Sequence, residues 1–297
     1  MTASALPDDV RAAVEGALGT IRSARPVGGG CISDAWRVET ADRAAFVKHN
    51  AAAPAAMFAA EADGLRALRA AAGEHLRVPA VLALGGDGGE SGGWIALEWL
   101  EPASPGRDHG ERLGRGLAAV HDGGDGGWGW ERDNWIGSLP QGNESAASWP
   151  DFWRDRRLGP QLDLARRAGR LPATEGEWAR LFDRLPGLLE AGDEEGPSLV
   201  HGDLWSGNAL ATSTGPAIID PAVYRGHREV DLAMAELFGG FGAAFFAAYD
   251  EARPLRPGYR EQRRGIYQLY YLLVHVNLFG GGYPRQTAGT LRAVLAP

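Results

Sequence analysis

The segment LVHGDLWSGN at residues 199–208, followed by IID at residues 218–220, indicates how this chain folds and where its chemistry lies. Asp203 and Asn208 stand on the loop that follows a short apolar strand, and Asp220 ends a second one. On such loops a carboxylate can be directed at a hydroxyl group and an amide oxygen at a metal ion. Taken alone, Asp203 also suits a turn, and Asp220 a turn or a helix cap. Their spacing after two strands favours a functional site over both alternatives.

The oxygen atoms of Asn208 and Asp220 are of the kind that Mg²⁺ prefers. This ion takes only one or two ligands from protein and leaves its other positions to phosphates and water. Asn208 and Asp220 are therefore the predicted metal ligands, and Asp203 is the predicted catalytic residue that serves an attacking hydroxyl. Together these assignments predict phosphoryl transfer from ATP with Mg²⁺ as the metal.

Lys48 is the single lysine among the 30 lysines and arginines of the chain. A site that needs only positive charge could have become arginine, so this exception points to a need for a compact ammonium. Glu61 falls on the apolar stripe of a helix predicted over residues 54–72, together with Phe58 and Leu65. An inward carboxylate requires a partner, and Lys48 on the neighbouring strand is the expected one. The alternatives are a chance surface lysine and a solvated Glu61 at the edge of the stripe.

Two further stretches suit a nucleotide. The glycine run at residues 28–30 lets the backbone approach phosphates closely, although a chain with 43 glycines uses most of them in turns. Residues 98–100 end the last strand before Pro102, where a hinge backbone can pair with an adenine edge. The predicted nucleotide-binding residues are Gly28, Gly29, Gly30, Lys48, Glu61, Glu98, Trp99 and Leu100.

The predicted elements divide the chain into two lobes. Residues 1–100 form a small nucleotide-binding lobe with helices at 8–24 and 54–72 and strands at 32–38, 44–48, 78–84 and 94–99. Residues 101–297 form a larger catalytic and substrate lobe with helices at 110–121, 151–169, 176–191, 229–249 and 259–279 and strands at 198–200 and 217–220. This pattern predicts an α+β fold whose site lies between the lobes.

Composition narrows the class of protein. With 44% hydrophobic and 23% charged residues, the chain resembles an ordinary globular protein. Its net charge of −8 argues against nucleic acid as a partner. We expect no membrane span and no signal peptide, because the longest apolar stretch is short and carries polar residues and the first 25 residues lack a basic start and an apolar core. The single cysteine, Cys31, cannot form an internal disulfide, so a cytoplasmic address is expected.

Several stretches of the sequence closely resemble the fructosamine kinase (ketosamine-3-kinase) family. They lie at residues 26–35, 46–48, 57–62, 134–137, 201–208, 220–222, 226–242 and 267–283 and so span nearly the whole chain. The resemblance implies the bilobal protein-kinase-like fold shared with aminoglycoside phosphotransferases. It also implies ATP-dependent phosphorylation of the sugar 3-hydroxyl of ketosamines, which are adducts of amines with reducing sugars. The phosphorylated adduct is unstable and releases the amine, so the implied role is deglycation.

The same resemblance assigns roles to single residues. It implies that Asp203 is catalytic, that Asn208 and Asp220 bind the metal, and that Lys48 paired with Glu61 positions phosphates. Two departures from protein kinases are visible. The metal motif at 220–222 is Asp-Pro-Ala instead of Asp-Phe-Gly, and a helix predicted from residue 229 leaves no room for an activation segment. A constitutively assembled site is therefore expected, with Asp231 bonded to the backbone of the catalytic loop.

Contacts to the substrate are harder to assign from sequence. Trp205 is placed to form a wall for a sugar, and His275 and Asn277 are placed to reach the site from the C-terminal helix, although each also suits core packing. A tryptophan cluster at 128–135 either lines the opening or packs a long loop. Cys31 in the predicted phosphate loop suggests a redox switch, with an inert thiol as the alternative.

Other functions of the same fold remain open from sequence alone. The rival enzyme is an aminoglycoside or amino-alcohol kinase, against which residues 226–242 and 267–283 argue. A rival of another class is a catalytically silent nucleotide-binding or redox-sensing protein, against which the full set of catalytic residues argues. The sequence leaves open whether the sugar is ribulosamine or fructosamine, what carries the amine, and whether the chain is a monomer or a homodimer.

Overall fold

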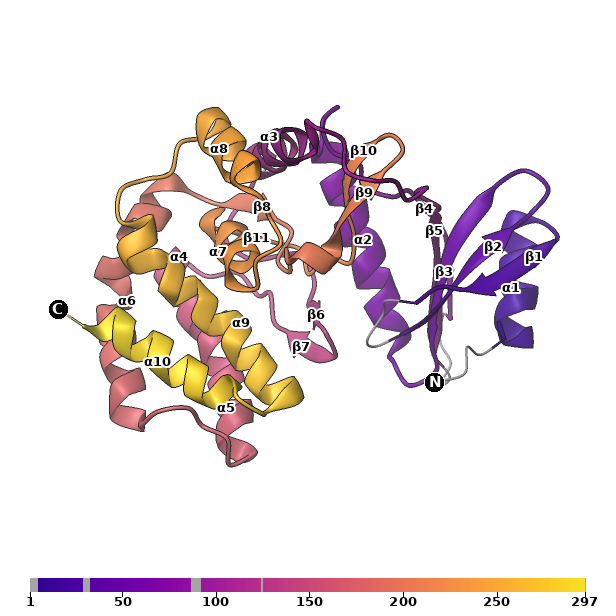
Figure 1. Cartoon of the computed structure of the whole chain (residues 1–297). Helices are drawn as coiled ribbons and strands as arrows, with labels where there is room; N and C mark the ends of the chain where they lie inside the picture. The colour runs from indigo at the N-terminus through magenta and orange to yellow at the C-terminus, as the bar shows by residue number, and fades with distance from the viewer. Residues whose placement is uncertain (1–4, 29–32, 87–91, 124, 297) are drawn as a thin grey trace.

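The computed structural model describes residues 5–28, 33–86, 92–123 and 125–296. Its N-terminal part is built on a five-stranded antiparallel sheet, seen at the right of Figure 1. The strands follow one another in the order β1 (Ser23–Pro26), β2 (Asp34–Glu39), β3 (Ala44–Asn50), β5 (Gly93–Glu98) and β4 (Val81–Gly85). Lys48 on β3 lies opposite Ile95 on β5, so it stands in the interior of the sheet.

The two faces of this sheet are covered by different helices, α1 (Asp8–Leu18) and α2 (Ala55–Ala71). Trp36 and Val47 belong to the core cluster that includes residues of α1. Ile95 belongs to the larger core cluster together with Leu65 of α2. Because side chains alternate along a strand, Lys48 points away from the face of Val47 and toward α2. The strand period therefore brings the lysine to the helix that carries Glu61.

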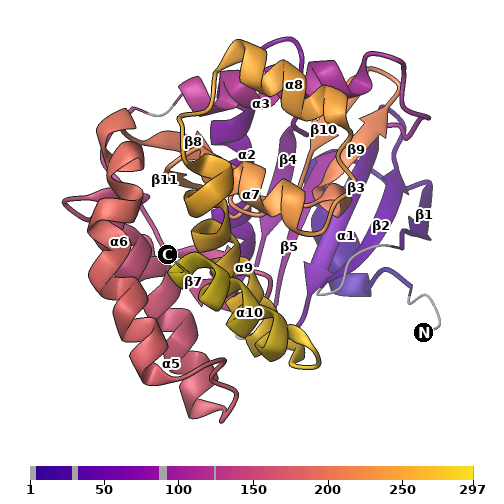
Figure 2. The ribbon, with the colours of Figure 1, turned by 60° about the vertical axis from the view of Figure 1, so that its left-hand side comes forward.

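The C-terminal part is mostly helical. Its helices are α3 (His109–Asp122), α4 (Trp149–Phe152), α5 (Gly159–Arg167), α6 (Glu175–Glu195), α7 (Glu229–Leu237), α8 (Ala243–Ala252), α9 (Arg264–Phe279) and α10 (Tyr283–Leu295). Shorter helical turns are the π-helices η1 (Trp153–Leu158) and η3 (Tyr259–Arg263) and the 3-10 helix η2 (Ser206–Asn208). Helix α9 contacts α5, α7 and α10 and forms the centre of this part (Figure 2).

Three short antiparallel strand pairs complete the C-terminal part. They are β6 (Asn134–Ile136) with β7 (Leu139–Gln141), β8 (Ser198–Val200) with β11 (Tyr224–Gly226), and β9 (Ala209–Thr212) with β10 (Gly215–Ile218). The catalytic segment predicted from sequence lies between β8 and β9, and Asp220 follows β10. The two predicted strands at 198–200 and 217–220 are thus present, the second beginning and ending slightly earlier.

The two parts of the chain touch well beyond the linker that joins them. The backbone of Arg77 pairs with β10, accepting from the N–H of Ile218 at 3.0 Å and donating to the carbonyl of Pro216 at 2.8 Å. Asp63 of α2 forms an ion pair with Arg132 at 2.9 Å. The backbone pairing joins the segment after α2 to β10, and the ion pair joins α2 itself to the C-terminal part.

Two predicted helices end earlier than expected. The helix predicted over residues 8–24 ends at Leu18, because Gly19 has a φ of 94° and the chain then enters β1. The helix predicted over residues 229–249 is divided into α7 and α8. Gly239 and Gly240 have φ angles of 70° and 95°, which are left-handed conformations that a helix cannot continue through. In both places a glycine overrides the apolar pattern around it.

Other differences concern elements that the apolar pattern does not reveal. Helix α10 was not predicted, nor were the short strands β1, β6, β7, β9 and β11. The predicted helices at 151–169 and 259–279 are helical, but each contains a π-helical turn, η1 or η3. In the described part of the chain, no helix combines the length and apolar character needed to cross a membrane.

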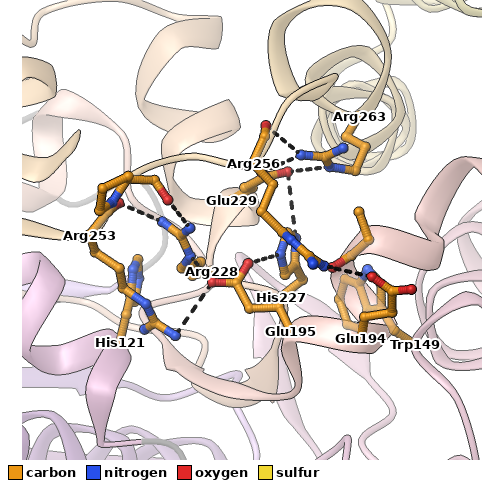
Figure 3. A network of polar contacts seen from close by, with 12 residues as sticks. His121, Trp149, Glu194, Glu195, His227, Arg228, Glu229, Arg253, Arg256 and Arg263 are labelled. Carbon is orange, nitrogen blue, oxygen red and sulfur yellow. Dashed lines mark hydrogen bonds and ion pairs between the residues drawn. The ribbon is translucent and has the colours of Figure 1, made fainter.

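A buried network of charges fixes the beginning of α7 (Figure 3). The guanidinium of Arg263 donates from Nε and Nη2 to the two carboxylate oxygens of Glu229, each at 2.7 Å. Arg228 donates from Nε to Glu195 at 2.6 Å, and the Nε2 atom of His227 lies 3.0 Å from the other oxygen of Glu195. We call these five residues the α7 anchor. Because α7 carries Asp231, the anchor also determines where that carboxylate stands.

Candidate active site

Three predicted residues form one charged cluster where the two parts of the chain meet. Nζ of Lys48 donates to Oε1 of Glu61 at 2.8 Å and also to the carboxylate of Asp220. The predicted contact between Lys48 and Glu61 is therefore present, whereas the contact with Asp220 was not predicted. Burial alone would lower the pKa of Lys48, but the charges of Glu61 and Asp220 outweigh burial and raise the pKa. The side chain accordingly remains an ammonium ion.

Asp220 reaches this cluster through an unusual backbone conformation. Its φ is 54°, a left-handed value that only one other non-glycine residue of the described chain, Ala173, also adopts. Such a conformation costs on the order of 1 kcal/mol and persists only where the surroundings hold it. Here Ile219 donates to the carbonyl of Asn208 at 3.0 Å, and Ala222 donates to the carbonyl of His201 at 2.9 Å. The segments on both sides of Asp220 are thus bonded to the loop that carries Asp203.

Asn208 connects Asp203 with the backbone of Asp220. Its Nδ2 donates to the carbonyl of Asp203 at 2.8 Å, to Oδ2 of Asp203 at 3.3 Å and to the carbonyl of Asp220 at 3.3 Å. Because the amide nitrogen makes all of these bonds, the amide oxygen Oδ1 is the atom left for a metal ion. The 3-10 turn η2, which ends at Asn208, brings the side chain back over the loop.

Asp203 forms no ion pair with a cationic side chain in the part of the chain that the structure describes. Burial raises the pKa of Asp203 to about 7, and the nearby negative charge of Asp220 adds to this effect. The hydrogen bond from Asn208 acts in the opposite direction but is too weak to cancel burial. A carboxylate that titrates near neutral pH is well matched to accept a proton from a hydroxyl group.

The loop itself is held from behind by α7. The N–H groups of His201 and Gly202 donate to the two oxygens of Asp231, at 2.7 and 2.9 Å. Nε2 of His121 lies 3.0 Å from Asp231, and Nδ1 of the same ring lies 2.7 Å from the hydroxyl of Tyr249. Burial lowers the pKa of His121, so the neutral ring donates to Asp231 and accepts from Tyr249. The expected bond between Asp231 and the catalytic-loop backbone is confirmed.

Gly202 shows why this loop tolerates no side chain at the position before Asp203. Its φ is 80°, and a Cβ atom placed there would lie 2.1 Å from the carbonyl oxygen of Ala222. The hydroxyl of Tyr271 on α9 donates to the carbonyl of Gly202 at 2.9 Å. The loop is therefore packed between the segment after Asp220 on one side and α9 on the other.

The residues predicted to bind the nucleotide differ in whether the structure describes them and in whether their side chains already have partners. Gly28 is described and exposed, whereas Gly29, Gly30 and Cys31 lie outside the described residues. The carboxylate of Glu98 accepts from Arg77 at 2.8 Å and from Arg69 at 3.2 Å, and so it is used within the protein. The indole nitrogen of Trp99 donates to Glu101 at 2.8 Å, and Leu100 is half-buried beside it. An adenine contact at Glu98, Trp99 and Leu100 would have to come from their backbone and stays a prediction.

The predicted substrate residues separate into two groups. Trp205 is 39% exposed and lies two positions after Asp203. His275 is half-buried, and its ring packs against Phe238 with centroids 4.7 Å apart. Asn277 instead donates to the carbonyl and the side chain of Gln161, at 2.9 and 2.8 Å, which joins α9 to α5. The structure thus leaves Trp205 exposed and His275 half-buried and gives Asn277 a packing contact, so the role of all three toward a substrate stays a prediction.

Some residues that shape the site were not singled out from sequence. Nδ2 of Asn134 donates to the carbonyl of Val223 at 2.7 Å, and Nε2 of Gln141 donates to the carbonyl of Ala222 at 3.2 Å. The hairpin β6–β7 thereby holds the segment after Asp220. The sequence offered one sign of this hairpin, the motif at 134–137, but the motif does not say which segment its side chains contact. The tryptophan cluster proves to pack at least in part, since Trp128 is buried with its ring centroid 5.0 Å from that of Trp149.

The oxygen atoms at the site fit Mg²⁺. Among the residues that the structure describes, no group of three or more histidine, cysteine, aspartate or glutamate side chains could form a metal site on its own. Mg²⁺ requires only one or two protein ligands when phosphates supply others. The carboxylate of Asp220 and Oδ1 of Asn208 can provide them, since the amide nitrogen of Asn208 bonds to the backbone carbonyl of Asp220 and so holds the two residues next to each other.

Comparisons with known proteins identify the family. The family model described as fructosamine kinase matches residues 6–297. A Synechocystis protein named a probable ketoamine kinase is 46% identical over 279 residues, which are 93% of this chain and 91% of the relative. The chloroplastic protein-ribulosamine 3-kinase of Arabidopsis thaliana is 40% identical over 91% of this chain and 81% of its own.

Solved structures agree with this result. A Thermobifida fusca protein provisionally named fructosamine-3-kinase superposes with a TM-score of 0.86 at 37% identity, over 98% of this chain and 99% of that one. An aminoglycoside phosphotransferase has a TM-score of 0.63 at 17% identity, over 97% of this chain and all of its own, and shows the shared fold. The predicted bilobal kinase-like α+β fold is confirmed. This chain belongs to the fructosamine kinase family.

Proposed function

We propose that this chain is an ATP-dependent kinase that phosphorylates the sugar 3-hydroxyl of ketosamines and so starts the release of the amine. The observation that carries the proposal is the cluster in which Lys48 contacts both Glu61 and Asp220 while Asn208 bonds to Asp203. Such a cluster serves phosphoryl transfer in kinase-like folds. The names of the Synechocystis and Arabidopsis relatives, ketoamine kinase and ribulosamine 3-kinase, supply the class of substrate.

Asp203 is the residue that we assign to the reacting hydroxyl. The hydroxyl proton passes to the Asp203 carboxylate as the sugar oxygen forms a bond to the γ-phosphorus of ATP. The bond between that phosphorus and the bridging oxygen of ADP breaks on the opposite side, in line with the attack. Because the Asp203 pKa is raised to about 7, the carboxylate accepts the proton more readily than an ordinary aspartate. Its main role is to hold the hydroxyl in line.

Lys48, Asn208 and Asp220 serve the phosphates. We expect the ammonium of Lys48 to keep Glu61 as its partner and to exchange its contact with Asp220 for phosphate oxygens. Asp220 and Asn208 would hold Mg²⁺, which supplies positive charge between the phosphate groups. Use of ATP is further supported by the phosphotransferase of the same fold, which was solved with AMP-PNP and hygromycin B. The cytoplasm supplies both ATP and Mg²⁺ and is the compartment that we propose.

The experiment is a substrate comparison. Mg²⁺-dependent ADP release by the purified protein is measured with ribuloselysine, fructoselysine, kanamycin and choline, with Asp203→Asn as the control variant. We expect turnover of at least one ketosamine and its loss in the variant. Turnover of kanamycin or choline alone would contradict the proposal that ketosamines are the substrates but would agree with the kinase mechanism. ATP binding without turnover of any acceptor would favour the silent or sensing alternative.

A further inference from the structure

Arg157 is a buried cation outside the set of residues that the proposed reaction uses. It belongs to the π-helix η1, and its side chain is 0% exposed. The central carbon of the guanidinium lies 3.8 Å from the ring centroid of Tyr224 and 4.6 Å from that of Phe152. A buried charge is costly unless its surroundings satisfy it, so the hydrogen bonds of Arg157 show what keeps it there.

Within the described residues, these hydrogen bonds end on uncharged oxygen atoms. Nη1 of Arg157 donates to the carbonyls of Gly142 at 2.8 Å and of Arg156 at 3.0 Å. Nη2 donates to Oδ1 of Asn143 at 2.7 Å. A guanidinium has donors and no acceptor, so it determines which end of the Asn143 amide faces it. The oxygen of Asn143 therefore points to Arg157, and the nitrogen Nδ2 points away.

The amide of Asn143 fixes the direction of a second amide. Nδ2 of Asn143 donates to Oδ1 of Asn134 at 3.0 Å, so Asn134 has its own nitrogen free for the other side. That nitrogen donates to the carbonyl of Val223 at 2.7 Å. Successive donors thus lead from Arg157 to the backbone of the segment after Asp220. If the Asn134 amide were reversed, its oxygen would face the oxygen of the Val223 carbonyl, and the bond would be lost.

A second branch reaches the same segment. Gln141 lies opposite Asn134 in the pair of β6 and β7. The hydroxyl of Tyr270 donates to Oε1 of Gln141 at 2.6 Å, which directs Nε2 to the other side. Nε2 donates to Oδ1 of Asn134 at 2.7 Å and to the carbonyl of Ala222 at 3.2 Å. The residues that we call the amide bridge are Arg157, Asn143, Asn134 and Gln141, and all four are buried.

The amide bridge holds the backbone next to a predicted metal ligand. Asp220 has a φ of 54°, a conformation that persists only where the surroundings hold it. The two carbonyls that the bridge binds belong to residues 222 and 223. Only Pro221 separates them from Asp220, and the ring of a proline fixes its own φ. A displacement of residues 222 and 223 would therefore be passed on to Asp220.

The bridge is also tied to the helix that carries Glu61. Nδ2 of Asn143 donates to the carbonyl of Arg132 at 3.1 Å, and the side chain of Arg132 forms an ion pair with Asp63 of α2 at 2.9 Å. In a connected buried network each hydrogen bond strengthens its neighbours. The bridge thus joins two segments that both contribute a carboxylate to the cluster around Lys48.

We propose that Arg157 is a positioning residue which, through the amide bridge, holds Asp220 in the orientation that binds Mg²⁺. The inference rests on the metal role of Asp220 in the proposed function. Loss of a residue that supports a metal ligand commonly weakens metal binding by about 10- to 100-fold, and Arg157 acts through two amides, so we expect an effect of about 5-fold. The affinity for Mg²⁺ should change, and the contacts of the nucleotide itself should not.

The test measures how much Mg²⁺ tightens the binding of ADP. Isothermal titration gives the Kd of ADP in excess Mg²⁺ and in EDTA, and the ratio of the two isolates the contribution of the metal. Arg157→Met keeps an apolar stem between the rings and removes the donors, so this ratio should fall about 5-fold while the Kd in EDTA is unchanged. Arg157→Lys keeps a charge and donors and should stay within about twofold of the wild type.

Asn143→Asp distinguishes a broken bridge from a weakened fold. The new carboxylate still accepts from Arg157 and gives that buried charge a partner, so the variant should remain folded. It has no donor for Asn134, and the ratio should again fall about 5-fold. Gln161→Met is the matched control, because this buried amide bonds to Asn277 and joins α5 to α9. It should lower the melting temperature and leave the ratio unchanged.

Two results would overturn this role of Arg157. One is an unchanged ratio in Asn143→Asp, which decides the matter alone if Arg157→Met does not fold. The other is an equal fall of the ratio in Gln161→Met, which would mean that the loss of any buried amide loosens the site. A wild type that binds ADP equally well with Mg²⁺ and with EDTA is a different result, which would overturn the metal role in the proposed function and this inference with it.

Discussion

Two clusters of buried charge in the C-terminal part each contain a buried carboxylate, and they shift its pKa in opposite directions. In the α7 anchor, burial alone would raise the pKa of Glu195, but hydrogen bonds from His227 and Arg228 outweigh burial and lower it to about 2. At the active site, burial raises the pKa of Asp203 to about 7, since the negative charge of Asp220 adds to the effect. Both carboxylates are buried, and a neighbouring cation decides whether the pKa of the carboxylate is lowered or raised.

The difference separates a cluster whose charges are paired within the protein from the cluster that we propose serves the chemistry. The anchor is satisfied within the protein, since the Glu229 carboxylate receives two bonds from Arg263 and neither side chain is exposed by more than 3%. At the site, Asp203 forms no ion pair with a cation among the described residues, and the amide of Asn208 bonds through its nitrogen. The paired cluster fixes α7 and, through Asp231, the loop of Asp203.

The largest effect is expected at Asp203. Asp203→Asn keeps the shape of the side chain but cannot accept a proton, so kcat should fall by roughly 10³-fold. The stability of this variant should rise, whereas its activity falls. Because folding raises this pKa, the stabilising contribution of the protonated carboxyl is lost as pH rises through about 7. At pH 8 the variant should therefore gain on the order of 2 kcal/mol in free energy of unfolding by urea titration. A variant with less activity and less stability would contradict the comparison.

The next largest effect is expected in the anchor. Arg263→Met removes both hydrogen bonds to the buried Glu229 carboxylate and leaves it the more distant His227, whose Nδ1 lies 3.6 Å away. This loss should lower the free energy of unfolding by about 3–5 kcal/mol. Urea denaturation measures this loss, and the KM for ATP of the protein that still folds should be near the wild-type value. Arg292→Met is the matched control, because it breaks an ion pair with Glu177 at the surface and should change stability little. Equal stability of the two variants would show that the anchor is not structural.

The sequence predictions succeeded where a local pattern sets the direction of a side chain and failed where the assembled fold sets it. The contact of Lys48 with Glu61 could be predicted, because the strand period and the helix period each give the direction of one side chain. Its contact with Asp220 could not, since it depends on a left-handed backbone at Asp220 that no local pattern demands. The exposure of Phe238 and Phe279 was equally hidden, because an apolar residue at a helix end reads as core until the helices are assembled.

The predicted helix boundaries were wrong for a related reason. The apolar pattern continues through residues 229–249, but Gly240 lies against Ser206 of the catalytic loop, and that distant contact decides where the chain bends. Local propensity gives way to tertiary contact at such a place. Asp231, by contrast, was correctly predicted to bond the backbone of the loop, because it stands in the first turn of a helix within a motif that resembles the family.

The raised pKa of Asp203 predicts a pH dependence that sharpens the contrast with Glu195. If Asp203 must be ionised to act, kcat/KM should fall about tenfold per pH unit below about 7 and be level above it. Initial rates between pH 5.5 and 9 at saturating Mg²⁺ measure the profile. The residual activity of Asp203→Asn should lack this acid limb. An acid limb with its midpoint near pH 4 would show that Asp203 behaves as an ordinary carboxylate.

A smaller effect is expected where α2 meets the segment after Asp220. A Cβ atom at Gly64 would lie 2.9 Å from Cγ2 of Val223 and 3.4 Å from Pro221, so Gly64→Ala should push α2 away and draw Glu61 from Lys48. We expect a several-fold rise in the KM for ATP, and its recovery in the double variant Gly64→Ala with Val223→Ala. Gly187→Ala is the control, because that helical glycine has open space and should only gain about 1 kcal/mol of helix stability. An unchanged KM would contradict this role of Gly64.

The most direct test of the central claim is the position of the phosphate in the product. The protein is incubated with ATP, Mg²⁺ and a ketosamine labelled with ¹³C in the sugar, and the product is followed by phosphorus and carbon NMR. The account predicts a phosphate on the 3-hydroxyl, followed by release of the free amine, and formation of this product roughly 10³-fold more slowly with Asp203→Asn. A phosphate on another hydroxyl, or formation of the 3-phosphate at an undiminished rate by Asp203→Asn, would contradict the claim that this aspartate directs the 3-hydroxyl to ATP.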